Sequence, residues 1–279
     1  MTDPVKTRIW AQQCLAEFDA ADSGLMQAAL ALAVLQDSRI DLETATGQVN
    51  RLVAAASAAF VADLPATLGD AVVLLNHVML DAQGFGGDHE TPEDPSNACM
   101  GRLLRRRRGL SAGLGIVYVH TARAVGLEAA AINFPDHVFI RLSQGKESVI
   151  VDPYHGGMQH GAAGLRALLK ALAGPDRELG REDYRPIDDR ALLMRLQMER
   201  KYLHMKASDS AGAARAIGGL LAIDAGEAEL LWEQGVLLLH SGDTAGGQDS
   251  LRRYLAREGE LGNRARAAEL LQSLTLQSA

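Results

Sequence analysis

Three short, partly β-branched runs interrupt a chain that otherwise has the pattern of helices. The runs are LEAAAIN, HVFIRLS and ESVIVDP, and turn residues separate them. Runs of this kind predict a small antiparallel sheet. Before and after them, apolar residues recur at helical spacing. The aromatic share is only 4%, in a chain rich in Ala and Leu, and this mixture also favours helices. The sequence therefore predicts an α+β fold.

The second and third runs predict a β-hairpin that holds two candidate functional side chains. A two-residue turn at Gln144-Gly145 would place His137 directly opposite Asp152, and strand alternation would put both on the face that carries Phe139. Opposed Cβ atoms in such a pair lie about 4.5–5.5 Å apart. A carboxylate there could orient the imidazole and stabilise its protonated form, as the third member of a catalytic triad does. A buried hydrogen bond that only holds the sheet is the alternative.

Ser111 is the candidate nucleophile. It follows Gly109 by two residues and stands at the start of a predicted helix within RRGLSAGLGIVYVHTARAVGL. A helix N-terminus stabilises negative charge, but Ser is also a favoured N-cap, and its hydroxyl needs an adjacent general base before it can attack. The N-cap and the nucleophile therefore both remain open. Cys99, in the polar loop or at the following helix start, has the pattern of a small packing residue.

Metal and nucleotide sites have little support in the spacing of residues. Asp88 to Glu90 with His77, and His155 with His160, supply ligand types, but neither set matches a known zinc spacing. The GFGG turn lacks the strand and helix context of a dinucleotide site. We therefore expect no metal and no other cofactor.

The charge of the chain limits the classes of partner that it can bind. The formal net charge is -7, which gives no electrostatic reason to expect binding to nucleic acid or to an anionic membrane. The run from Arg105 to Arg108 is a local exception. It stands at a predicted helix end, where cations complement the helix dipole, and an anion-facing patch is the alternative.

The expected location is the cytoplasm. Cys14 and Cys99 lie far apart and imply no disulfide framework, which fits a reducing compartment. The start MTDPVKTRIW lacks the apolar core of a signal peptide. The apolar stretch GLMQAALALAVLQ is shorter than the roughly 20 residues that span a bilayer.

The chain divides into three predicted parts. Helices are expected from about Arg8 to Leu80, with breaks near Asp22, Asp37 and Leu64-Pro65. The polar loop GFGGDHETPEDPSN leads into a further helix, the Ser111 helix and the sheet. After the helix GLRALLKALAG, the stretch GPDRELGREDYRPIDDR is the candidate boundary. Beyond it the pattern is helical to the end.

The C-terminal helices contain a degenerate repeat at the roughly 34-residue period of tetratricopeptide repeats. Gly235 fits the small position of the first repeat helix, but one period earlier Lys201 stands there. The second-helix packing positions are Ala213, Ile217 and Leu220 in one copy, and Gly247, Leu251 and Tyr254 in the next. A polar final helix over about 264–273 could cap the array.

Several ordered motifs resemble the transglutaminase-like superfamily. They are RRGLSAGLGIVYVHTARAVGL, INFPDHVFIRL and VIVDPYHGGM, and LNHVMLDAQGFGGD and DPSNACM extend the resemblance upstream. Within the superfamily the chain is most similar to the bacterial Sir-B-type family. That resemblance implies a helical N-terminal region at 1–83, a transglutaminase-like (papain-like) core at 84–175 and tetratricopeptide-like repeats at 187–279.

The resemblance also implies which residues occupy the triad positions. Active members of the superfamily use Cys, His and Asp. His137 and Asp152 match the last two, whereas the Cys position falls on Ser111, and Sir-B-type proteins typically have Pro there. The implied function is a non-catalytic or catalytically altered cytoplasmic module that binds or regulates a protein or peptide through its repeats.

An enzyme remains the alternative function. In that case Ser111, activated by His137 and oriented through Asp152, would attack an amide or ester carbonyl as a hydrolase or acyltransferase without a cofactor. The sequence leaves open whether the protein is an enzyme.

Overall fold

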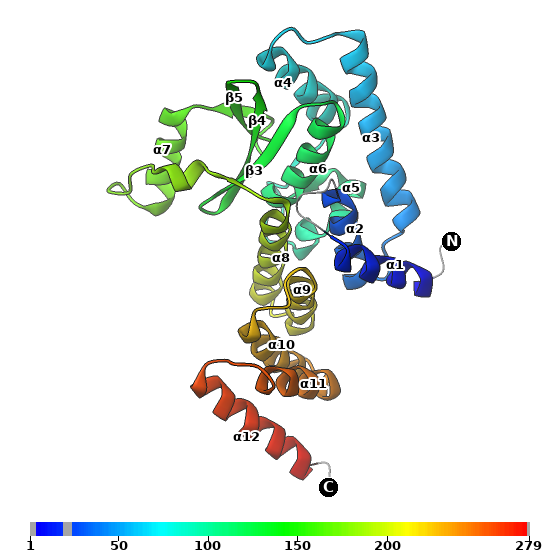
Figure 1. The fold of residues 1–279 in the computed structure, drawn as a ribbon, viewed down its shortest axis with the longest axis vertical. Coiled ribbons are helices and arrows are strands. Elements are labelled where there is room, and N and C mark those ends of the chain that lie inside the picture. The colour runs from blue at the N-terminus through cyan, green and yellow to red at the C-terminus, as the bar shows by residue number, and fades with distance from the viewer. Residues whose placement is uncertain (1–3, 19–23, 278–279) are drawn as a thin grey trace. The chain divides into compact units, whose positions relative to one another are not determined.

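The computed structural model describes residues 4–18 and 24–277 (Figure 1). The chain divides into two compact units, Met1–Leu196 and Gln197–Ala279. Helices dominate both, and the first unit also holds a sheet, so the predicted α+β class is confirmed. Among the helices of the described part, none is both long and apolar enough to cross a lipid bilayer.

The first unit begins with the helices α1 (Pro4–Ala16), α2 (Leu25–Gln36), α3 (Leu42–Ala62) and α4 (Leu68–Asn76). Predicted breaks near Asp37 and Leu64-Pro65 are confirmed, because each falls between two of these helices. The predicted break near Asp22 lies outside the described residues. Local capping explains two of the starts: Asp41 accepts backbone N–H groups of α3, and Thr67 forms a capping box with Asp70 at α4.

Helix α2 is the buried centre of this helical layer. Its sequence LMQAALALAVLQ is apolar on nearly every side, and nearly all of it is buried. It packs against α1, α3, α5 (Met100–Arg106) and α6 (Ser111–Ala124). Directly after α2, Asp37 accepts a hydrogen bond from Arg102 of α5 at 2.9 Å. The guanidinium groups of Arg39 and Arg102 hold the pKa of Asp37 well below its usual range.

A five-stranded antiparallel sheet stands between two helices of the first unit. Its order is β6-β5-β4-β3-β7, with β3 (Glu128–Phe134), β4 (His137–Gln144), β5 (Glu147–Asp152), β6 (Met158–His160) and β7 (Pro186–Ile187). Helix α6 packs on one face, where a Cβ on Gly115 would lie 3.1 Å from Ile140. On the other face, α7 (Ala162–Ala173) adds Leu165 and Leu169 to the cluster that contains Phe139. Figure 1 shows α6 and α7 on opposite sides of the strands.

Strand β7 lies inside GPDRELGREDYRPIDDR, the candidate boundary of the sequence analysis. It pairs with β3, so this stretch belongs to the first compact unit. The division between the units falls after Leu196, within the helix α8 (Asp189–Lys206).

The hairpin between β4 and β5 forms, but the predicted register was wrong. Gln144 pairs with Glu147, so the turn residues are Gly145-Lys146. The φ of Gly145 is 61°. A type II′ turn needs Gly at its first central position, whereas the prediction put Gly145 second. The observed register differs from the predicted one because the turn begins one residue later, at Gly145.

The shifted register keeps the predicted faces. Continued to the end of β5, it sets Phe139, rather than His137, opposite Asp152. His137 lies two residues from Phe139, and side chains alternate with a period of two, so His137 and Asp152 still share a face. They meet as diagonal neighbours and not as a directly opposed pair.

The basic run binds the protein's own polar loop. Arg106 ends α5, and its guanidinium donates to Asp88 at 2.5 Å and to the side-chain oxygen of Asn97 at 3.0 Å. Arg107 and Arg108 donate to backbone carbonyls at the start of the loop. The short element η1 (His77–Ala82) precedes the loop. The loop itself carries β1 (Gly86–Gly87) and leads into η2 (Pro95–Ala98), and β1 pairs in parallel with β2 (Arg108–Gly109). The predicted helix end is confirmed. Three of the four arginines donate hydrogen bonds to the loop or to the residue directly before it.

Gly157 marks a close approach between the turn after β5 and the end of α4. Its φ is 75°, and a Cβ there would lie 2.4 Å from the Asn76 side chain. Asn76 Nδ2 donates to the Gly157 carbonyl at 3.0 Å, and Asn76 Oδ1 accepts from the buried Tyr118 hydroxyl at 2.8 Å. Asn76 therefore joins α4, α6 and the turn that follows Asp152.

We expect Gly157→Ala to lower the free energy of unfolding by about 2–4 kcal/mol, because it combines left-handed backbone strain with steric overlap at Asn76. Gly156→Ala is the matched control: its φ is 66°, but no atom lies within 4 Å of the added Cβ. It should lose only the strain, about 1–2 kcal/mol. Urea denaturation of both variants measures the difference, and equal losses would contradict this explanation.

The second unit is built from α8, α9 (Ser210–Ile223), α10 (Ala228–His240), α11 (Thr244–Leu255) and α12 (Leu261–Gln277). Helix α10 packs against α9 and α11, and α11 packs against α12. Short turns join these helices, as in antiparallel helical hairpins. Asp209 and Asp243 start α9 and α11 by accepting backbone N–H groups of their first turns.

Small residues set the spacing of these helices. A Cβ on Gly235 would lie 2.8 Å from Leu251 and 3.3 Å from the carbonyl of Gly247, and Ala213 is fully buried. In the earlier copy, Lys201 occupies the position that corresponds to Gly235. Its Nζ donates to Oε2 of Glu233 at 2.9 Å. Ala213 and Gly247 are thus buried, as the repeat pattern predicts, and the tetratricopeptide assignment itself stays a prediction.

Candidate functional site

Ser111 is the first residue of α6, and its hydroxyl does not cap the helix. The N-cap is Leu110, which has an extended backbone and makes no side-chain capping bond. Ser111 Oγ instead accepts the backbone N–H of Val138 at 3.1 Å, and the residue is 6% exposed. Of the two alternatives that the sequence left open for Ser111, the N-cap was therefore wrong. The hydroxyl joins the start of α6 to the start of β4, because both elements begin at the same end of the sheet.

His137 and Asp152 form the centre of the site. Nε2 of His137 lies 2.9 Å from Oδ1 of Asp152. A carboxylate can only accept, so Nε2 carries the proton, and in the neutral ring Nδ1 is left as the acceptor. This is the tautomer that a general base needs.

A second imidazole binds the same carboxylate. Nδ1 of His155 donates to Oδ2 of Asp152 at 2.7 Å, and the rings of His155 and His137 stack with their centroids 5.5 Å apart. From the sequence, His155 was expected only as a ligand type paired with His160. The spacing D-x-x-H after a strand was the available signal, because a tight turn can bring such residues together.

The turn after β5 fixes the position of Asp152. The backbone N–H groups of Tyr154 and His155 donate to Oδ1 at 3.0 and 3.3 Å. Burial alone would raise the pKa of Asp152, but its hydrogen bonds and charge interactions with His137 and His155 outweigh burial and lower the pKa. Asp152 is thus a buried, ionised carboxylate with four donors.

His160 lies at the edge of this cluster without a hydrogen bond to it. Its Nε2 is 3.9 Å from Oδ2 of Asp152, which is too long for a hydrogen bond. This atom is buried, and it has no hydrogen-bond partner among the described residues. Burial lowers the pKa of His160, against the opposing charge of Asp152.

The three triad positions lie close together, but their side chains do not form a continuous chain of hydrogen bonds. Within the described part of the chain, no hydrogen bond joins Ser111 Oγ to His137, while His137 and Asp152 are bonded. Activation of a serine hydroxyl needs its proton to be within reach of the base. Cys99 contributes nothing here: it is 2% exposed at the start of α5.

A polar hollow of about 480 Å³ opens beside the cluster. Tyr154 and His89 line it, and their rings are 4.8 Å apart. Arg106 and Arg108 add positive charge to the lining. His77, the other candidate ligand of the upstream set, lies away from it and pairs with Asp81 at 3.3 Å.

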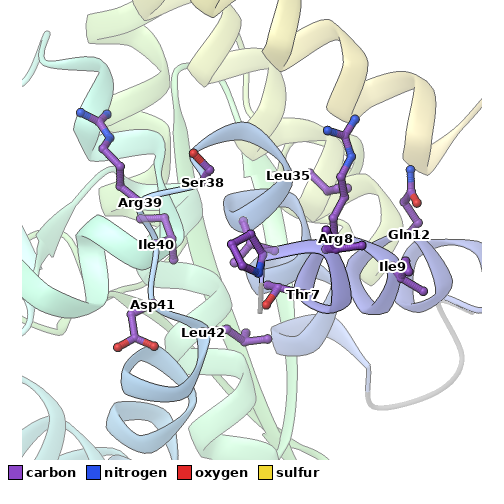
Figure 2. A pocket seen from close by; sticks show the side chains of 13 residues that line it. Thr7, Arg8, Ile9, Gln12, Leu35, Ser38, Arg39, Ile40, Asp41 and Leu42 are labelled. Carbon is purple, nitrogen blue, oxygen red and sulfur yellow. The ribbon is translucent and has the colours of Figure 1, made fainter. Parts of the chain in front are cut away.

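A second hollow, of about 650 Å³, shares no residue with the cluster. Figure 2 shows it between α1 and the connection from α2 to α3. Thr7, Arg8 and Gln12 approach it from α1, and Arg39 and Asp41 from the connection. Its lining contains neither His nor Cys, so it offers no group for acid–base or thiol chemistry near neutral pH.

Comparisons with known proteins match the part of the chain that holds Ser111, His137 and Asp152. A family model described as the transglutaminase-like superfamily matches residues 43–198. A UPF0162 protein of Xylella fastidiosa is 26% identical over 184 residues, which is 65% of this chain and 66% of that protein, just under two thirds of its length. A UPF0162 protein of Vibrio cholerae is 27% identical over 71% of this chain and 75% of its own.

One solved structure is similar at low identity. It is titled as a crystal structure of menin that reveals the binding site for the Mixed Lineage Leukemia protein. The similarity covers 91% of this chain and 70% of that one, with a TM-score of 0.40 and 11% identity, and at this level it supports no conclusion about the fold or the site.

Proposed function

This chain belongs to the transglutaminase-like superfamily, and we propose that it is a protein-binding or regulatory module whose core performs no thiol chemistry. The proposal includes a Sir-B-type organisation with a helical N-terminal region, a transglutaminase-like core and tetratricopeptide-like repeats, and a cytoplasmic location. Its partner is a protein or peptide, bound through the C-terminal helices.

The position of Ser111 carries the proposal. Active superfamily members are expected to hold a thiol where this chain has Ser111, and a hydroxyl without a bonded base is a poor nucleophile at neutral pH. Here the hydroxyl accepts a backbone N–H and is 6% exposed. The His137–Asp152 pair remains, and without a nucleophile it joins the start of β4 to the end of β5.

An apolar stripe on α8 supports the binding role. Met198, Tyr202 and Met205 lie on one helical face and are 45%, 61% and 46% exposed. All three belong to the second compact unit. Exposed apolar side chains that form a stripe mark interaction surfaces, and Met adapts to varied partners. The stripe fits a peptide segment with apolar side chains.

We expect Tyr202→Glu combined with Met205→Glu to abolish capture of the partner, because the charges remove the apolar contact. The measurement is affinity capture with the full chain followed by mass spectrometry. Leu261→Glu is the matched control, since Leu261 is 85% exposed in the same unit. A partner held by the wild type and the control but lost by the double variant supports the proposal. Identical capture by all three proteins would contradict it.

The competing function is a serine hydrolase or acyltransferase, favoured by the 2.9 Å bond between His137 and Asp152. The two functions differ in the reactivity of the wild-type protein. A serine-directed acylating probe should leave Ser111 unlabelled if the core is non-catalytic. Rapid labelling of Ser111 that disappears in His137→Ala would establish the enzyme instead.

A further inference from the structure

Metal-ligating atoms of three side chains converge at the end of β5. They belong to His137, Asp152 and His155, and all lie within 4.8 Å of one another. Nε2 of His137 and Nδ1 of His155 are the nitrogens that hydrogen-bond to Asp152. Two imidazoles and one carboxylate form a ligand set that zinc uses. The geometry points to a Zn²⁺ site at this cluster, with His137, Asp152 and His155 as ligands.

His160 supplies an independent observation that points to a ligand. Its Nε2 is buried, has no hydrogen-bond partner among the described residues, and faces Asp152 Oδ2 at 3.9 Å. The side chain is only 10% exposed, and the ring of Phe139 packs on it with a centroid distance of 5.1 Å. An unpartnered polar atom in such a place is costly unless something binds it. We assign His160 as the fourth ligand.

Movements of these side chains would convert the hydrogen-bonded cluster into a coordination shell. With metal–ligand bonds of about 2.0–2.1 Å, the ligand atoms of a tetrahedral zinc site lie about 3.3 Å apart. The His137 nitrogen now lies 2.9 Å from Oδ1 of Asp152, whereas the nitrogens of His155 and His160 lie 2.7 and 3.9 Å from Oδ2. With Oδ2 as the zinc ligand, the His155 nitrogen must draw back from Oδ2 and the His160 nitrogen must approach it, each by about half an ångström. His160 must also move toward the two imidazoles, since it lies outside the group whose ligating atoms converge within 4.8 Å.

Protons are conserved in this change. His137 and His155 each carry the proton on the nitrogen that now faces Asp152. On binding, each neutral ring moves that proton to its other nitrogen, so no proton is released. The backbone N–H groups of Tyr154 and His155 stay bonded to Asp152 and orient it, as outer partners of metal ligands do.

The cluster is accessible to an ion. The His155 side chain is 51% exposed, and the hollow beside Tyr154 opens next to it. Bound zinc would also remove His137 and Asp152 from acid–base chemistry. The inference goes beyond the proposed binding function and does not depend on it, because it concerns the first compact unit alone.

The test uses the full chain without a histidine tag, stripped by a chelator and titrated with ZnCl₂ in competition with a chromophoric chelator. Binding of one equivalent is expected. His155→Ala should weaken it by at least about tenfold, since even outer partners of a ligand account for 10–100-fold. His77→Ala is the matched control, because it also removes an imidazole bonded to a carboxylate. It should bind zinc as the wild type does.

Titration with CoCl₂ gives a second readout of the same site. A four-coordinate site of nitrogen and oxygen ligands produces intense visible absorption, and His160→Phe should weaken that absorption if His160 closes the shell. Absence of zinc binding by the wild type would overturn the inference. So would equal affinity in His155→Ala, a loss in His77→Ala, or a weak octahedral cobalt spectrum, which would place the ion at surface carboxylates.

Discussion

Ser111→Cys should create a thiol that reacts with an alkylating agent faster than Cys14 or Cys99. Two influences act on a sulfur at this position: the N-terminus of α6, where Ser111 is the first residue, and the imidazole of His137 next to Val138. Both lower the pKa of a thiol. The midpoint of the pH–rate profile should fall below the pKa of about 8.5 of a free cysteine.

The two natural cysteines are the internal standards. Burial and the nearby charge of Glu17 raise the pKa of Cys14, and Cys99 is only 2% exposed. Neither should compete with a thiolate at position 111. Alkylation by iodoacetamide across a pH series, in the presence of a chelator that keeps His137 free of metal and read by mass spectrometry of each cysteine peptide, gives the three rates.

The role of the imidazole is tested in the double variant Ser111→Cys with His137→Ala. Its midpoint should move upward, because only the helix N-terminus remains to stabilise the thiolate. The wild type should keep its partner binding under mild alkylation. An unreactive cysteine at position 111 would mean that the start of α6 is closed to reagents, and that the similarity to the superfamily extends only to the fold.

Asp152→Ala should lower the free energy of unfolding by about 3–5 kcal/mol, because it leaves buried donors without their charged acceptor. Asp152 is 2% exposed and accepts from His137, His155 and the backbone of Tyr154 and His155. Urea denaturation in the presence of a chelator measures the loss without any contribution from metal. Asp81→Ala is the control, since Asp81 bonds His77 at an exposed surface. It should change stability by less than about 1 kcal/mol.

The same carboxylate predicts a dependence on pH. The pKa of Asp152 is lower in the folded chain than in the unfolded chain. Its stabilising contribution is therefore complete above the ordinary aspartate pKa of about 3.9, and it is lost as the pH falls through the lowered folded value. The stability difference between wild type and Asp152→Ala should shrink in acid. A difference that stays constant from neutral pH to pH 3 would contradict the assignment of an ionised Asp152.

The sequence determined the local elements. The apolar spacing and the breaks near Asp37 and Leu64-Pro65 predicted the helices α2 to α4, and the partly β-branched runs predicted β3, β4 and β5. The sequence also determined which side chains share a face, because along a strand this depends only on whether two residues are an even or an odd number of positions apart. That is why His137 and Asp152 meet although the predicted register was wrong.

Contacts between distant segments were decided by the tertiary structure. The turn at Gly145-Lys146 set the register, since the positive φ of Gly145 suits the first position of a type II′ turn. The bond from Val138 to Ser111 spans 27 residues, and no local rule shows whether a serine at a helix start will cap its helix or accept from a neighbouring strand.

The cluster around Asp152 also combines features of the local sequence with contacts that only the tertiary structure makes. The sequence shows four residues with ligating side chains, at spacings that match no known zinc site. Folding brings His137 from β4 and His155 and His160 from the turn and strand after β5 to one carboxylate. The physical reason is that a metal or catalytic site needs side chains that are close in space, and pairing of strands makes residues neighbours without regard to their separation along the chain.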